Sequence, residues 1–279
     1  FVEYLIANFD SITSSLSGEL KTEMMDAMGK VIAGCHDEGV RTKLTLELMA
    51  NLNQRWQFLQ SQFDSSDPDC LLNALYILRC NRFVANNVGV AYHVQLQLIL
   101  ENIIQLYLAC SSTCNQIIAQ TGEQNITSDL FRISAQLKST ILQILITFTK
   151  ATKQQAFITT NILPPVMMFL LEDFQQSSPF SRVPELLNLL EVMLLQLDDN
   201  ALNSHMANIL LMVFSPSVDL IREDFDSFFD FRIPLADFMA AVIKKSFDVF
   251  LSMGDEGVPI FVNAALWGCQ HPNVDICKR

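Results

Sequence analysis

Charged residues, glycine and proline are all scarce in this sequence. Charged side chains make up 17% of the 279 residues and hydrophobic ones 50%, with nine glycines and nine prolines. Disordered chains combine low hydrophobicity with high charge, so the composition predicts a folded protein. Stretches of alternating polarity rich in β-branched residues are nearly absent. Leu, Ile, Met, Ala and Gln dominate instead, which favours helices because straight-chain side chains lose little rotamer freedom in them.

Positive charge is also in short supply. Lys and Arg number 18 against 30 Asp and Glu, which gives a net charge of −12. An acidic surface repels phosphate backbones, so we expect no direct contact with nucleic acid. The same field attracts and steers a partner protein that carries basic patches.

Long apolar runs are missing too. A membrane-spanning helix needs about 18 consistently apolar residues, and we find no such run. Residues 102–122 lack charge but contain many Asn, Gln and Ser side chains, and the uncharged residues 154–171 are divided by Pro164-Pro165. The sequence therefore predicts no membrane insertion. No signal peptide is visible, and the chain opens directly in an apolar helical pattern, so we expect a fragment of a longer helical array.

Catalytic motifs are absent as well. Gly29-Lys30 lacks the earlier glycine of a phosphate-binding loop, and no Ser, Cys or Thr lies in a nucleophile elbow. The sequence therefore predicts a protein without catalytic residues or cofactors that acts by binding other proteins. The histidines, which are the commonest general bases, have no evident acidic partner; they are His36, His93, His205 and His271.

The cysteines are odd in number and irregular in spacing. Cys110 and Cys114 share one helix face with no further ligand nearby in sequence. The spacing of Cys269, His271 and Cys277 matches no common zinc pattern. We therefore predict reduced, mostly buried thiols and no bound metal. The seven cysteines are Cys35, Cys70, Cys80, Cys110, Cys114, Cys269 and Cys277.

What the sequence does contain is apolar residues at helical spacing, separated by polar breaks. Steps of three and four residues run through 96–117, 130–148 and 186–197, and each run forms one apolar stripe. Asp67-Pro68 and Ser128 are typical helix starts. The pattern predicts about a dozen helices with no strand between them.

These helices pair naturally into consecutive hairpins. We predict an all-α fold over residues 1–279, an α-solenoid of stacked antiparallel hairpins of the HEAT type that forms an armadillo-type superhelix. A compact all-α bundle is the alternative. The predicted hairpins are 1–36, 39–86, 89–151, 154–198 and 201–253, followed by a half repeat at 257–271.

Three segments have a special composition. Residues 186–190, LLNLL, could be mistaken for an export signal, but their spacing predicts the buried face of a helix. In residues 224–231, DFDSFFDF, phenylalanines alternate with acids, and we favour a packed loop over an exposed docking segment. Pro164-Pro165 predicts a kink, or the first turn of a new segment capped by Thr160 or Asn161.

Several short motifs resemble one family. Residues 161–166, NILPPV, followed by 172–175, EDFQ, resemble a helix of the exportin-1 family of the importin-β (karyopherin) superfamily. Residues 182–187, RVPELL, and the opening residues 1–6, FVEYLI, also resemble that family, and the match in order spans nearly the whole chain. The resemblance implies HEAT repeats from the middle to late part of a ring-shaped transport receptor.

The same resemblance implies partners and a site. Receptors of this family carry proteins with leucine-rich export signals together with Ran-GTP, so we expect these cargo proteins, Ran-GTP and nucleoporins as partners, and shuttling between nucleus and cytoplasm. Cargo and Ran-GTP strengthen each other's binding, which is a coupling free energy between two sites. The export-signal groove lies between two outer helices, the second of which resembles residues 1–16. Its wall would consist of Phe1, Leu5, Ile12 and Leu16.

Two alternatives stay open. The four wall residues could instead pack inward against the helix at 19–36. The first groove helix, with the family's reactive cysteine, is absent from this chain, and helix 39–64 lacks the proline expected between its halves, which indicates a distant relative. The alternative function is a HEAT-type scaffold for protein–protein interaction in a larger assembly.

Overall fold

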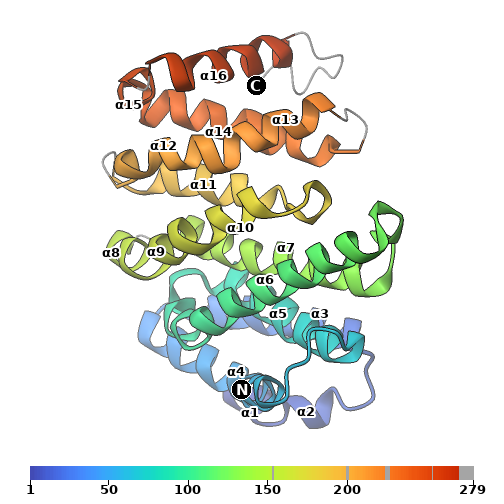
Figure 1. The fold of residues 1–279 in the computed structure, drawn as a ribbon. Helices are drawn as coiled ribbons and strands as arrows, with labels where there is room; N and C mark the ends of the chain where they lie inside the picture. The colour runs from blue at the N-terminus through green and yellow to red at the C-terminus, as the bar shows by residue number, and fades with distance from the viewer. Residues whose placement is uncertain (153, 199–200, 224–226, 253, 270–279) are drawn as a thin grey trace. The chain divides into compact units, whose positions relative to one another are not determined.

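The protein is built from helices joined by short turns, as a computed structural model shows (Figure 1). Helices account for 86% of the structure, and the residues it describes include no strand, so the all-α prediction is confirmed. The chain divides into two compact units, Phe1–Lys153 and Gln154–Arg279. The residues described are 1–152, 154–198, 201–223, 227–252 and 254–269.

The helices of the first unit form two layers. α3, α5 and α7 pack extensively side by side in one layer, while α4 lies between α1 and α6 in the other, with looser contacts (Figure 1). The α4–α5 and α6–α7 hairpins connect the layers. The bounds are α1 Val2–Ala7, α2 Phe9–Ile12, α3 Gly18–Ala33, α4 Glu38–Ser61, α5 Pro68–Val88, α6 His93–Thr121 and α7 Asp129–Ala151, with 3₁₀ turns at Gly89–Tyr92 and Glu123–Asn125.

Helix starts in this unit follow the sequence signals. The Asp67 carboxylate accepts a hydrogen bond from the Asp69 amide at 3.0 Å, and Pro68 occupies the first turn of α5. The Ser128 hydroxyl accepts from the Phe131 amide at 3.4 Å at the start of α7. Both predicted caps are confirmed. They satisfy amide groups that have no partner within the helix.

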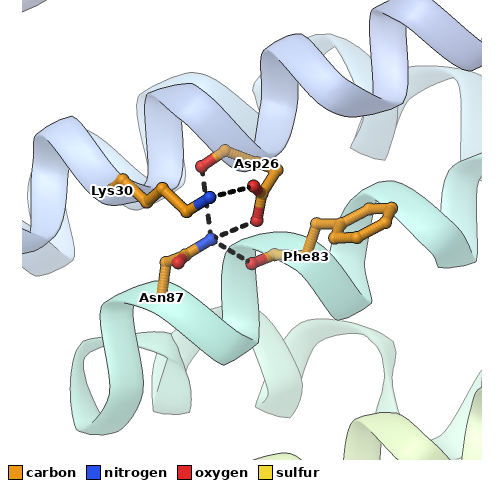
Figure 2. A network of polar contacts seen from close by, with 4 residues as sticks. All are labelled: Asp26, Lys30, Phe83 and Asn87. Carbon is orange, nitrogen blue, oxygen red and sulfur yellow. Dashed lines mark hydrogen bonds and ion pairs between the residues drawn. The ribbon is translucent and has the colours of Figure 1, made fainter.

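A polar contact joins α3 to α5 within their layer (Figure 2). The Asn87 side-chain amide donates to the Asp26 carboxylate at 2.8 Å, to the Asp26 carbonyl at 3.2 Å and to the Phe83 carbonyl at 2.8 Å. Lys30 pairs with the other carboxylate oxygen of Asp26 at 2.6 Å. A Cβ atom at Gly29 would lie 3.1 Å from the Asn87 side chain, so the glycine allows Asn87 to approach α3.

These hydrogen-bond partners stabilise the ionised form of the Asp26 carboxyl group. The pKa of Asp26 is lowered, chiefly by the hydrogen bond from Lys30 and further by the one from Asn87, although partial burial acts in the opposite direction. A carboxyl group whose pKa falls on folding contributes stability above its unfolded pKa, and this contribution is lost as the pH falls through the folded pKa.

A second polar network lies in the core between α4, α5 and α6. Gln95 exchanges two hydrogen bonds with Asn53, at 2.8 and 2.9 Å, and also donates to Asn81 at 3.1 Å. The Tyr92 hydroxyl donates to the same Asn81 oxygen at 2.7 Å. Burial raises the pKa of Tyr92 well above its ordinary value. Because buried polar groups need partners, this network fixes the relative positions of three helices.

The second unit contains the remaining helices. α11 packs along α14, α13 contacts α14, and α16 contacts both α14 and α15. The bounds are α8 Gln155–Phe157, α9 Leu163–Pro165, α10 Leu171–Gln176, α11 Glu185–Gln196, α12 Met206–Ile209, α13 Ser215–Glu223, α14 Arg232–Lys245, α15 Phe247–Ser252 and α16 Gly254–Cys269. π-Helical segments lie at Ile158–Ile162, Val166–Leu170 and Leu210–Phe214, and 3₁₀ turns at Pro179–Ser181, Asn203–His205 and Phe229–Phe231.

The stretch from α8 to α10 is one helical path that alternates between α and π turns. An α-helical turn takes about 3.6 residues, so side chains four apart drift by about 40° at each step. One series of buried residues here comes at every fourth position, with Leu163 and Leu171 buried beside it, and wider π turns keep the series on one face. The series is Ile158, Ile162, Val166, Leu170 and Phe174, none more than 1% exposed.

The π turns also accommodate the proline pair. Pro164 and Pro165 lie in the first turn of α9, between two π-helical segments, and the backbone stays helical, with φ −64° and ψ −31° at Pro165. The predicted cap is wrong. Ile162 precedes α9 without a side-chain cap, and the Asn161 amide donates backwards to the Phe157 carbonyl at 3.0 Å. The prolines therefore lie in the first turn of a segment, as predicted, and a widened turn in place of a cap relieves their clash with the preceding turn.

Arg182 closes the end of this helical path. Its Nε donates to the Phe174 carbonyl at 2.8 Å and its Nη2 to the Gln175 carbonyl at 3.1 Å. The guanidinium also lies 5.5 Å from the centre of the Phe174 ring. The Arg182 guanidinium therefore does two things at once: it donates to two carbonyls at the end of the helix and packs on the face of an aromatic ring.

The two remaining special segments can be compared with the structure. Leu186 and Leu190 are fully buried in α11, as predicted. Phe228 and Phe231 are buried and contact Phe180 and Phe174, with ring centroids 5.0 and 6.3 Å apart, which confirms packing for these two. The prediction is wrong for Phe229, which is 61% exposed, and residues 224–226 lie outside the described residues.

Removing the Asn87 side chain should destabilise the first unit. We expect Asn87→Ala to lower the free energy of unfolding by about 1–2 kcal/mol at pH 7, because Asp26 loses a hydrogen bond to its charged form. The loss should shrink below about pH 4, as Asp26 becomes protonated. Urea unfolding at several pH values measures this. Asn86→Ala, an exposed neighbour on α5, is the control, and equal losses for both variants would contradict the assignment.

Replacing both prolines of α9 should change little. We expect Pro164→Ala/Pro165→Ala to keep its helical content by circular dichroism and to change the free energy of unfolding by less than about 1 kcal/mol. The reason is that the π turns already relieve the proline clash and the four-residue burial pattern persists. Pro259→Ala, inside α16, is the comparison. If the double variant instead raised the free energy of unfolding by about 3 kcal/mol, the two prolines would be straining the helical stretch from α8 to α10.

Candidate protein-binding surface

Two of the predicted wall residues lie on short helices, Leu5 on α1 and Ile12 on α2, whereas Phe1 precedes α1 and Leu16 follows α2. The helix expected at 1–16 is interrupted at Asn8, where α1 ends, and α2 ends at Ile12. The Asn8 amide donates to the Tyr4 carbonyl at 2.8 Å, and the Thr13 hydroxyl donates to the Phe9 carbonyl at 2.8 Å. Short polar side chains compete with backbone amides in this way and end helices early.

α1 and α2 are attached to α4 by polar contacts. Glu3 pairs with Lys43 at 3.4 Å, and the Asn51 amide donates to the Asp10 carboxylate. The pKa of Lys43 is raised, first by the charge of Glu47 and then by Glu3. Neither α1 nor α2 contains a buried residue, so α4 holds them through surface contacts of the kind that contribute little individually.

The four wall residues differ in exposure. Phe1 is 90% exposed and Ile12 is 46% exposed, whereas Leu5 and Leu16 are half-buried. Tyr4, which the sequence analysis did not select, is 67% exposed. We call these three exposed apolar side chains, Phe1, Tyr4 and Ile12, the wall face.

Two grooves flank the C-terminal half of α4. One, with a volume of about 250 Å³, lies between α4 and α6 and is lined by Trp56, Leu59 and Phe63 on one side and Asn102 and Leu106 on the other. The second, with a volume of about 420 Å³, lies between α4 and α5, and Phe58, 68% exposed, contributes to its lining. Both combine apolar side chains with amides, a composition suited to peptides rather than to catalysis.

The cysteines are free, and most are deeply placed. Cys70, Cys80, Cys110 and Cys114 are buried and Cys35 is half-buried, so the predicted burial is confirmed for the cysteines whose side chains the structure describes. Burial raises the pKa of both the Cys80 and Cys110 thiols to about 12. A protonated thiol is a poor nucleophile, so these cysteines pack rather than react.

Metal ligands do not gather in the described part of the chain. No group of three or more His, Cys, Asp and Glu side chains could hold a metal ion there. The side chains of Cys269, His271 and Cys277, which the sequence analysis weighed as a zinc site, lie outside the described residues.

One buried cation was not anticipated from the sequence. Lys138 on α7 is fully buried, donates to the Ser111 hydroxyl at 2.8 Å and lies 4.9 Å from the centre of the Tyr107 ring. The apolar stripe through 130–148 contains no signal that marks this lysine as internal. Lys138 joins α7 to α6 through its hydrogen bond to Ser111 and its cation–π interaction with Tyr107.

Two helical stretches have the length and composition of membrane spans. They are Gln155–Gln176 and Asn203–Glu223, with mean hydropathies of 1.2 and 1.3, and 39% and 50% of their apolar windows are buried in the structure. The sequence analysis considered only the first of them. Core helices of folded proteins share these properties, and each stretch here packs within the second unit.

Comparison with known proteins agrees with the resemblance carried by the proline pair. Residues 95–279 match the family model described as CRM1 C terminal. The chain is 23% identical to Protein EXPORTIN 1B of Arabidopsis thaliana, 21% to Exportin-1 of Schizosaccharomyces pombe and 22% to Exportin-1 of Drosophila melanogaster. These alignments cover 97–100% of this chain and 26% of each relative, so the chain spans about a quarter of their length. The chain therefore belongs to the CRM1 C-terminal family.

Proposed function

We propose that this chain is a segment of a nuclear export receptor, which binds proteins bearing leucine-rich export signals together with Ran-GTP. Membership of the CRM1 C-terminal family and the exportin names of its relatives support the export role. The observation that supports a cargo site on this chain is the wall face, whose Phe1 and Ile12 side chains are 90% and 46% exposed. Exposed apolar patches of this kind mark interaction sites.

The geometry suits an apolar signal peptide. Phe1, Tyr4 and Ile12 are each exposed, and apolar side chains of a peptide would gain the free energy of burial against them. The half-buried Leu5 and Leu16 would form the floor of the same surface. The proposed groove is completed by a further helix on the other side of the wall face, which the receptor as a whole supplies.

Ran-GTP and nucleoporins are the other proposed partners. The net charge of −12 favours partners with basic surfaces, and two-site coupling makes cargo and Ran-GTP strengthen each other's binding. The proposed receptor moves between nucleus and cytoplasm and performs no chemistry of its own. Transport would follow because the proposed receptor binds cargo more tightly in the compartment that contains Ran-GTP than in the other.

The export role is tested by nucleotide-dependent binding. We expect the full-length protein to bind an immobilised leucine-rich export-signal peptide with Ran-GTP present and far less with Ran-GDP. Surface plasmon resonance with both nucleotide states measures this. Equal binding with both states would contradict the proposal and would favour a HEAT-type scaffold, which has no reason to distinguish them.

The wall face is tested separately by substitution. We expect Phe1→Ala/Ile12→Ala in the full-length protein to weaken the peptide by about a hundredfold or more in the presence of Ran-GTP, since each truncation removes apolar area worth about 1.5 kcal/mol or more. Leu98→Ala is the matched control, because Leu98 is 59% exposed on α6 away from the wall face. An unchanged affinity in the double variant would place the cargo elsewhere.

A further inference from the structure

α1 and α2 cover only part of the α4 face on which they lie. α4 has 24 residues, and the polar contacts from α1 and α2 reach Lys43 near its start and Asn51 just past its midpoint. After Ile12 the chain turns and leaves toward α3. Among the described residues, Phe58, about two turns beyond Asn51 on α4, is 68% exposed.

The uncovered part of α4 borders the groove of about 420 Å³ described above, which we call the α4–α5 groove. α4 contributes Asn51, Gln54 and Phe58 to its lining, and α5 contributes Asn73 and Ile77. Ile77 is buried at 3% exposure, whereas Phe58 projects from the opposite wall. Amide side chains can both donate to and accept from the backbone of an extended peptide, and the apolar walls can hold its side chains.

Arg55 is the only charged side chain that lines this groove. Its guanidinium lies 5.1 Å from the centre of the Tyr76 ring, which holds it beside α5. In the described part of the chain, no carboxylate forms an ion pair with Arg55. The Asp10 carboxylate accepts a hydrogen bond from Asn51, which lines the groove. A cationic groove in a chain of net charge −12 is complementary to a negatively charged ligand group.

We propose that the α4–α5 groove is a second peptide-docking site, separate from the wall face, for an extended partner segment that combines apolar side chains with an acidic residue. Phe58, Leu59 and Ile77 contact the apolar side chains, and Arg55 binds the carboxylate. The amides of Gln54 and Asn73 pair with the peptide backbone. The early end of α2 at Ile12 leaves this site open.

Fluorescence anisotropy of the full-length protein tests the site. The probe is a labelled peptide of alternating Leu and Glu, compared with peptides in which Gln or Lys replaces every Glu. We expect the Glu peptide to bind most tightly and the Lys peptide most weakly. Phe58→Ala should weaken the Glu peptide at least fivefold, and Arg55→Gln should remove the preference for Glu over Gln.

Matched controls separate this site from other surfaces. Leu98→Ala and Arg79→Gln remove an exposed apolar side chain and an exposed cation of the same unit outside the groove, and both should leave binding unchanged. Phe1→Ala, which alters the wall face, should weaken the Glu peptide less than Phe58→Ala does. If Phe1→Ala weakens the Glu peptide while Phe58→Ala does not, the probe binds the wall face and the second site is disproved, although the proposed export function is not. Absence of binding, or tightest binding of the Lys peptide, also overturns the proposal.

Discussion

The close contact between α3 and α5 sets the spacing on which the first unit depends. Gly29 leaves room for Asn87, and Asn87 in turn holds the carboxylate and carbonyl of Asp26. α7 continues the same layer beside α5. α3, α5 and α7 therefore pack closely, and polar contacts join α3 to α5. α1, α4 and α6, in the other layer, pack more loosely against one another.

That difference between layers creates the binding surfaces. α4 and α6 make fewer contacts with each other than α5 and α7 do, so the space between outer helices remains as grooves. α1 and α2 are shorter still and are held by surface polar contacts, which leaves the wall face on one side and the α4–α5 groove on the other. The open surfaces of the first unit therefore follow from the closer packing of the layer formed by α3, α5 and α7.

The second unit shows how a helix adapts to a fixed pattern of burial. From α8 to α10, a series of buried residues comes at every fourth position, at Ile158, Ile162 and Val166 and onward, and a regular α-helix cannot keep that spacing on one face. Alternating α and π turns can, and they also admit Pro164 and Pro165. The rules for proline capping in ordinary α-helices led to the wrong cap, because they do not include widened turns.

The sequence by itself determined the helical class, the caps at Asp67 and Ser128, the burial of most cysteines and, through the proline motif, the family. These follow from local propensity and periodicity, which act over a few residues. Only the tertiary structure decided that residues 1–16 form two short helices, that Lys138 is buried and that the groove beside Phe58 stays open. Those outcomes depend on which helices become neighbours, because a side chain's exposure is set by the surface packed against it, and local sequence does not encode that surface.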